Sequence, residues 1–268
     1  MKKKYIIFIT AVFLICILCA FFFFVGSREK NFIIKRIAHA GGIINDTTYT
    51  DSIDALNSNL KKGFSYFELD FSFTSDNNLV CTHGWGDNFA KIFGYKPMEI
   101  PTLEEFLQLN KAKSKFNICT LDSLADWMRN NPSAYIITDI KENNEKNVLE
   151  ALSLMAKKIP DFKFRIIPQI YLPDEFDKVK KMGYQQIIWT LYKYNSSDAD
   201  VLSAVKNFTG PFAITMPQLR AKTNLPLELA KLKIPTYTHT VNSLDDKNEF
   251  IKKYSVSEIY TDSLLPNQ

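Results

Sequence analysis

The residues best suited to chemistry are three histidines and several acidic side chains that stand beside apolar runs. Glu68 and Asp70 alternate with aromatic and aliphatic residues between Tyr66 and Thr74, which is the pattern of a β-strand. Successive side chains of a strand point to opposite faces, so the two carboxylates share one face, about 7 Å apart along the backbone. Such a pair either belongs to a solvated strand face or has a cation between its members.

His83 ends a return arm that begins at Leu79, after the polar stretch 75–78. Serine, aspartate and asparagine favour a tight turn there, so a β-hairpin is predicted. A four-residue loop pairs Asp70 with His83, and a two-residue loop pairs Ser72 with His83. Both registers place His83 on the carboxylate face, because the side chains of a strand alternate. Taken alone, the hairpin is equally well explained by a polar side that faces water.

Further polar residues end other apolar runs of the chain. His39 ends the first run of the globular part, and Gly41 behind it permits close approach of a ligand to the backbone. Asp139 and Lys141 share a face at the end of a later run, and His239 ends another. Taken singly, each is explained by packing or by an ion pair, so their joint occurrence is what indicates a site.

Short apolar strands and amphipathic helices alternate from residue 33 to the end of the chain. Asp51 or Ser52 is expected to be the N-cap of the first helix. Strands are predicted near residues 33, 66, 135, 164, 186, 212, 234 and 258. This rhythm predicts an α/β fold, a (β/α)8 TIM barrel, with 79–83 as an additional arm. Side chains at the carboxyl ends of barrel strands meet at one mouth.

At such a mouth, the chemistry of the predicted set is that of phosphodiester cleavage. Glu68, Asp70 and Asp139 offer the oxygen ligands that one divalent cation, Mg²⁺ or Ca²⁺, prefers. His39 and His83 suit general acid and base roles. Lys141 adds a positive charge for the phosphoryl oxygens.

The segments that contain these residues resemble the glycerophosphodiester phosphodiesterase family, within the phospholipase-C-like phosphodiesterase superfamily. The resemblance implies a TIM barrel whose metal is bound by Glu68, Asp70 and Asp139, with His39 and His83 as the acid and base. It also implies that Lys141 lies near phosphate. The matching segments are Ile37–Gly41, Phe67–Asp70, Thr74–Asp76, Leu79–His83, Pro101–Leu103, Ile137–Lys141, Thr240–Asn242 and Ile259–Asp262.

Five positions depart from the pattern of that family. Ala40 stands where the family usually has arginine, Thr50-Asp51 stands for Glu-Asn, His239 stands where tryptophan is frequent, and Asp139 stands for glutamate. One phosphate clamp of the family is therefore missing, and the expected substrate is a glycerophosphodiester, a lysophospholipid or a related envelope phosphodiester. Three alternatives stay open: a binding or assembly protein without turnover, a lyase that forms a cyclic phosphate, and a metal-dependent enzyme that acts on a carbonyl or enolate.

Three residues of the sequence have two readings each. Trp85 and His239 are predicted substrate contacts beside the mouth, with core packing as the alternative. Asp262 is expected to be structural, with a role as a ligand as the alternative.

The N-terminus predicts a membrane anchor. Lys2, Lys3 and Lys4 precede an uncharged run, Tyr5–Gly26, with about 21 apolar residues, enough for roughly 30 Å of helix. Residues 1–30 are predicted to be an uncleaved signal anchor, with a cleaved signal peptide as the alternative. The lysines predict that the barrel, residues 31–268, lies on the extracytoplasmic side.

Charge and cysteine content limit the partners. The net charge is +4, of which the three N-terminal lysines supply a large part, so nothing indicates nucleic acid. The expected partners are a phosphodiester small molecule or lipid headgroup, and the membrane through the N-terminal helix. The four cysteines have no zinc-site spacing, and a Cys81–Cys119 disulfide is left open.

Overall fold

The computed structural model describes residue 32 and residues 34–113, 115–141 and 145–268, with only the backbone described for 110–113. Phe32–Gln268 is a compact unit separate from residues 1–31, and all features below belong to it. The predicted membrane anchor, residues 1–30, lies outside the described residues. Within the described ranges, no helix has both the length and the apolar character needed to cross a bilayer.

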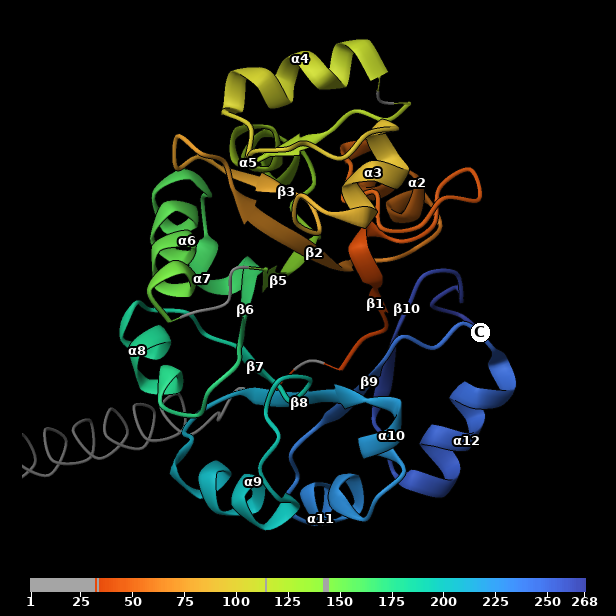
Figure 1. Ribbon diagram of the computed structural model, residues 1–268. Coiled ribbons are helices and arrows are strands. Elements are labelled where there is room, and N and C mark those ends of the chain that lie inside the picture. The colour runs from red at the N-terminus through yellow and green to blue at the C-terminus, as the bar shows by residue number, and fades with distance from the viewer. Residues whose placement is uncertain (1–31, 33, 114, 142–144) are drawn as a thin grey trace, which may run out of the picture. The chain divides into compact units, whose positions relative to one another are not determined.

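In the described part of the chain, eight parallel strands form a closed barrel with helices around it (Figure 1). The ring closes because β1 pairs with both β2 and β10. In order around the barrel the strands are β1 (Ile37–Ala38), β2 (Tyr66–Phe73), β5 (Tyr135–Ile140), β6 (Ile166–Ile170), β7 (Ile187–Thr190), β8 (Phe212–Pro217), β9 (Thr236–His239) and β10 (Glu258–Thr261). The predicted (β/α)8 barrel is therefore confirmed.

Helices connect these strands, and polar caps fix where several of them begin. The helices are α2 (Ile53–Lys61), α5 (Leu121–Asn130), α6 (Glu145–Lys158), α7 (Phe162–Arg165), α8 (Glu175–Lys181), α9 (Asp198–Ala204), α10 (Gln218–Ala221), α11 (Leu225–Lys231) and α12 (Leu244–Tyr254), with 3-10 turns η1 (His39–Gly41) and η2 (Val205–Asn207). Ser52, Thr120, Ser197 and Ser243 accept first-turn N–H groups of α2, α5, α9 and α12. Of the two predicted N-caps, Ser52 is the one observed.

The barrel interior is an apolar plug to which every strand contributes one residue. Phe32 adds to these eight side chains, which are Ile37, Tyr66, Ile137, Ile167, Ile188, Ala213, Tyr237 and Tyr260. Because strand side chains alternate, the residue two positions further along each strand also faces the interior, nearer the carboxyl end. On β2 these residues are Glu68 and then Asp70, whereas Phe67, Leu69 and Phe71 pack under the helices. The plug is thus the floor on which the polar mouth is built.

A segment inserted between β2 and β5 carries the His83 arm. It contains β3 (Leu79–Cys81), α3 (Asp87–Phe93), α4 (Leu103–Lys113) and β4 (Cys119–Thr120). Cys81 pairs with Cys119 across the antiparallel strands and is bonded to it in a disulfide. Phe89, Phe93 and Phe106 form a separate small core with Val80.

The register of the β2–β3 hairpin differs from both predicted registers. Phe73 pairs with Leu79 across a five-residue turn, so Thr82 rather than His83 lies opposite Asp70. The predicted register was wrong because the Thr74 hydroxyl makes hydrogen bonds within the turn. Its Oγ1 accepts a hydrogen bond from Asn78 N at 2.9 Å and donates to Asp76 Oδ1. His83 instead reaches the mouth because the chain leaves the ladder after Cys81.

Candidate active site

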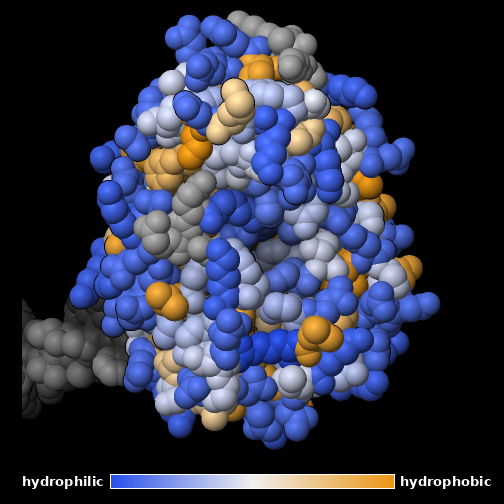
Figure 2. Space-filling view, viewed as in Figure 1, coloured by the Kyte–Doolittle hydropathy of each residue, from blue (hydrophilic) through white to orange (hydrophobic). Residues whose placement is uncertain are grey.

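A cavity of about 430 Å³ opens at the carboxyl ends of the barrel strands. Below it, a smaller cavity of about 40 Å³ reaches Glu68, Gln169 and the plug residue Tyr260. The face drawn in Figure 2 is hollowed near its centre and mostly hydrophilic around the hollow. The larger cavity is lined by His39, Tyr49, His83, Asp139, Lys141, Tyr192, Lys193, His239 and Thr240.

Three buried carboxylates meet at the base of this mouth. Glu68, Asp70 and Asp139 each offer one oxygen, and these oxygens lie within 4.8 Å of one another. Lys141 Nζ lies 2.5 Å from Asp70 Oδ1 and 2.8 Å from Asp139 Oδ2. Glu68 Oε1 and Asp70 Oδ2 are buried without a hydrogen-bond partner among the described residues. A carboxylate oxygen in that state is costly unless a proton or a cation compensates it.

The charges of the cluster shift the pKa values of its members. Burial, followed by the nearby Asp70 and Asp139, raises the pKa of Glu68 well above its usual range. Burial also acts to raise the pKa of Asp139, but Lys141 and Tyr171 outweigh it and the net shift is downward. Burial acts to lower the pKa of Lys141, yet its acidic neighbours raise that pKa well above the usual value. One ammonium therefore serves several carboxylates, which leaves an excess of negative charge that suits a divalent cation.

Asp139 is fixed by two tyrosines. The hydroxyl of Tyr171 donates a short hydrogen bond to Asp139 Oδ1, and the hydroxyl of Tyr192 lies 3.5 Å from the same oxygen. Ile140 N donates to Tyr171 Oη at 2.8 Å, so the tyrosine is itself held by β5. Only Oδ2 of Asp139 then faces Lys141. An aspartate held in this way has one oxygen to offer to a metal.

His39 is oriented by a buried acidic partner. It lies in η1 directly after β1, and its Nδ1 donates to Asp262 Oδ1 at 2.9 Å, because a carboxylate only accepts. Asn242 Nδ2 donates to Asp262 Oδ2 at 2.7 Å. His39 Nε2 lies 4.0 Å from Glu68 Oε2. In the neutral imidazole the free electron pair is therefore on Nε2, which faces the carboxylate cluster.

His83 and His39 line the same cavity, although they come from segments far apart in sequence. Tyr49 lies between their rings, with centroids 4.7 Å from His39 and 5.4 Å from His83. The two predicted proton-transfer residues are thus brought together at the mouth, beside Asp139 and Lys141.

His239 lines both cavities, as expected of a substrate contact. Its Nδ1 lies 3.0 Å from Thr215 Oγ1. Burial, with the nearby His39 as the next cause, lowers the pKa of His239 to about 4. The ring is therefore a neutral hydrogen-bonding group at physiological pH.

Two other predicted substrate contacts have packing partners instead. Trp85 is not among the described residues that line the mouth; its Nε1 donates to Phe73 O at 3.1 Å, and its ring contacts Phe89 and Phe106. Gly41 is buried with φ +80°, and a Cβ there would lie 3.3 Å from Ala55 Cβ, so glycine is needed for close packing against α2. The large apolar surface of the indole explains its place in the small core.

Several site residues were not predicted from the sequence. Asp262 was expected to be structural, and its side chain is the hydrogen-bond partner of His39. Its position could have been found from the strand period, because Asp262 follows the interior residue Tyr260 by two positions. Tyr171 and Tyr49 have no local sequence signal. Asp51 is fully buried, and its Oδ1 accepts from Asp70 N at 3.0 Å.

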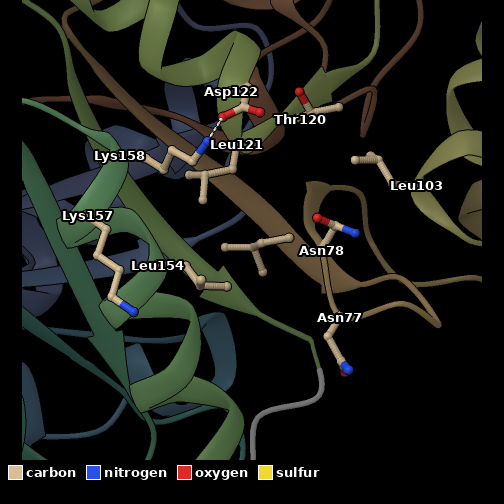
Figure 3. A pocket seen from close by; sticks show the side chains of 10 residues that line it. Asn77, Asn78, Leu103, Thr120, Leu121, Asp122, Leu154, Lys157 and Lys158 are labelled. Carbon is tan, nitrogen blue, oxygen red and sulfur yellow. Dashed lines mark hydrogen bonds and ion pairs between the residues drawn. The ribbon is translucent and has the colours of Figure 1, made fainter.

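A second hollow, of about 140 Å³, lies between the β2–β3 turn and helices α5 and α6 (Figure 3). Asn77 and Asn78 stand on one side of it, and Lys158 pairs with Asp122 at 2.6 Å on the other. It shares no described lining residue with the mouth cavity. Because the described residues that line it include neither a histidine nor a cluster of carboxylates, the mouth is the better candidate site.

Comparisons with known proteins agree on the fold. No protein-family model matches the sequence, and neither does a curated protein. Solved structures do match. A glycerophosphodiester phosphodiesterase from Thermotoga maritima has 18% identity and a TM-score of 0.65, over 86% of this chain and 95% of that one. One from Parabacteroides distasonis has 19% identity and a TM-score of 0.64, over 87% and 93%.

A third match is an Oleispira antarctica phosphodiesterase in complex with its product sn-glycerol-3-phosphate. It has 13% identity and a TM-score of 0.64, over 87% of this chain and 94% of that one. These likenesses show that the chain has the TIM-barrel fold found in glycerophosphodiester phosphodiesterases. The class that fold and site define is a TIM barrel with an acidic cluster and paired histidines at its mouth.

Proposed function

We propose that the protein is a metal-dependent phosphodiesterase that hydrolyses a glycerophosphodiester, a lysophospholipid or a related envelope phosphodiester. The observation that carries the proposal is that His39, His83, Asp139 and Lys141 line one cavity, directly above Glu68. The likeness of the fold to solved glycerophosphodiester phosphodiesterases supports the proposal. The glycerol phosphate product of the Oleispira enzyme supports the substrate class.

Glu68, Asp70 and Asp139 would hold one divalent cation, Mg²⁺ or Ca²⁺, since carboxylate oxygens are hard ligands, and Glu68 Oε1 and Asp70 Oδ2 have no hydrogen-bond partner among the described residues. Such a cation supplies charge neutralisation at the phosphoryl oxygens. Lys141 contributes a second positive charge to the same oxygens. His239, neutral and held by Thr215, is assigned to hydrogen bonding with the substrate.

His39 is assigned as the general base. Its Nε2 has the free electron pair, and Asp262 stabilises the imidazolium that forms when a proton is taken from the attacking nucleophile. His83 then donates a proton to the leaving alkoxide from the other side of Tyr49. With water as the nucleophile, its oxygen forms the new bond to phosphorus as the P–O bond to the leaving alcohol breaks, so the products are a phosphomonoester and a neutral alcohol.

The test is release of alcohol and phosphomonoester from a panel of glycerophosphodiesters and lysophospholipids, with and without a chelator. We expect turnover in the untreated enzyme, loss with chelator, restoration by Mg²⁺ or Ca²⁺, and loss in His39→Ala and His83→Ala. Leu219→Ala, an exposed position on α10, is the matched control. Activity that survives both chelation and His39→Ala refutes the mechanism.

The same assays separate the rival functions. Phosphorus NMR distinguishes hydrolysis from a lyase, because a lyase releases a cyclic phosphate. Full binding of the cation without turnover on any diester favours a binding or assembly protein, for which Ala40 and Thr50 are the motivating observations. Ala40 is fully buried, and its backbone N donates to Glu68 Oε2 at 2.8 Å, so this position offers no side chain to a phosphate.

An extracytoplasmic, membrane-anchored location is part of the proposal. It rests on the apolar run Tyr5–Gly26 behind three lysines. The Cys81–Cys119 disulfide agrees with it, because disulfides persist mainly in oxidising compartments. Protease added to cells whose outer envelope layers are opened while the cytoplasmic membrane stays intact should digest the barrel but not the N-terminus. A barrel protected until the cytoplasmic membrane is broken would exclude a periplasmic or extracellular location.

A further inference from the structure

Tyr49 touches both histidines that are assigned to proton transfer. Its ring makes interplanar angles of 87° with His39 and 80° with His83, at centroid distances of 4.7 and 5.4 Å. Both contacts have the edge-to-face geometry that aromatic rings favour over face-to-face stacking. One side chain thus contacts two imidazoles that come from separate segments of the chain.

The loop that holds Tyr49 is fixed at both ends to the His39 side of the site. Ile43 N donates to Asp262 O at 2.8 Å, and Asp51 N donates to Ala40 O at 3.3 Å. Tyr49 itself has φ +58°, a left-handed conformation that bulky residues rarely adopt. Such a conformation persists only where the surrounding structure holds it. Here it places the Tyr49 ring beside the two histidines.

The two histidines differ in their other supports. His39 has the carboxylate of Asp262 behind it, at 2.9 Å. Among the described residues, the His83 ring has no hydrogen-bond partner, and its contact with Tyr49 is the aromatic one. His83 also lies outside the β3 ladder, which ends at Cys81. Its orientation therefore depends on the Tyr49 ring more than that of His39 does.

We propose that Tyr49 is a positioning residue whose ring sets the spacing and orientation of His39 and His83. The hydroxyl is not required for this role. Burial, followed by the charge of Asp262, raises the pKa of the Tyr49 hydroxyl to about 12. The ring therefore stays neutral and makes the same contacts across the pH range of an enzyme assay.

The consequence for turnover rests on the proposed function. Removing the ring frees His83 and loosens His39, so kcat for the phosphodiester should fall by about 10- to 100-fold, the range expected when reacting groups shift by up to an ångström. KM should change less, because the carboxylates, Lys141 and His239 are untouched.

The positioning itself is measured without turnover. The chain has three histidines, so the labelled imidazole carbons of the full chain in detergent give three resolvable NMR signals. In Tyr49→Leu, the signals of His39 and His83 should move and that of His239 should stay. Tyr49→Phe keeps the ring and should restore both signals and kcat. Tyr192→Leu is the matched control, since Tyr192 contacts His239 and should move that signal instead.

Two outcomes overturn the inference. One is a Tyr49→Leu protein whose His39 and His83 signals are unmoved; the other is a Tyr49→Phe protein as perturbed as Tyr49→Leu, which would assign the role to the hydroxyl. If the leucine variant does not fold, Tyr49→Met takes its place with the same expectations. Expected NMR shifts in an enzyme with no diesterase activity refute the proposed function alone, and unmoved signals in an active enzyme refute the role of Tyr49 alone.

Discussion

Asp262 Oδ1 lies 2.9 Å from His39 Nδ1, although 223 positions separate the two residues in the sequence. The pair forms because β1 and β10 are neighbours where the barrel closes, with Ile37 beside Tyr260. The residue two places after each of these plug residues faces the mouth. The contact between the first and last strands is thus what orients the proposed base.

Replacing Asp262 by asparagine should lower kcat about 100-fold, within the usual contribution of general acid–base catalysis, and change KM little. The amide cannot stabilise the His39 imidazolium as a carboxylate does. Steady-state kinetics on the best diester measures the change. Asp245→Asn, an exposed acid at the start of α12, is the control and should keep the wild-type kcat. A wild-type kcat in Asp262→Asn would remove this carboxylate from the mechanism.

Tyr171→Phe should weaken divalent cation binding about 10-fold, because groups that orient a metal ligand typically affect affinity by this order. The hydroxyl that holds Asp139 Oδ1 is lost, while the buried ring stays. Isothermal titration with Mg²⁺ and Ca²⁺ measures it. Tyr184→Phe is the matched control: its hydroxyl is also buried but donates to Leu152 O at 2.7 Å. Equal affinity losses in the two variants would point to a general destabilisation instead.

The Cys81–Cys119 disulfide closes a loop with a sequence separation of 38. The chain-entropy model assigns such a loop about 4 kcal/mol of unfolding free energy, as an upper value. Urea unfolding should show this loss when the wild type is reduced. The Cys81→Ser/Cys119→Ser variant should show the same loss and no response to reductant. A reductant response that persists in the double variant would trace the effect to the remaining Cys16 and Cys19.

The sequence was sufficient for the barrel because short apolar strands alternate with amphipathic helices along the whole described part of the chain. It also identified the set Glu68, Asp70, Asp139 and Lys141, because period-two alternation places these side chains on the inner face. The His83 register could not be obtained, since it depended on the hydrogen bonds of a five-residue turn.

Other features depend on tertiary contacts alone. The pairing of Asp262 with His39 requires barrel closure, and the place of Tyr49 requires a left-handed backbone within an irregular loop. Trp85 beside a predicted mouth was open to two readings, and only the fold of α3 and α4 decides that its ring packs on Phe89 and Phe106.

His239 should make the barrel less stable in mild acid. Its pKa in the folded protein is lowered to about 4 by burial and by the neighbouring His39, against about 6.5 for an unfolded histidine. As pH falls through 6.5 the unfolded chain takes up a proton that the folded chain does not. The contribution is a loss of stability that grows between pH 6.5 and 4, up to about 3 kcal/mol, and is constant below that.

His239→Gln should remove this part of the pH dependence while keeping a polar group beside Thr215. The charges of Asp139 and Lys141 also act on the His239 ring. The raised pKa values of Glu68 and Asp51 make the folded barrel more stable as the pH falls, which opposes the effect of His239. All four groups are present in both the wild type and His239→Gln. Urea unfolding at pH 7 and pH 4.5 therefore gives a larger loss in the wild type than in His239→Gln. Parallel pH profiles would show that the folded barrel does not lower the pKa of His239.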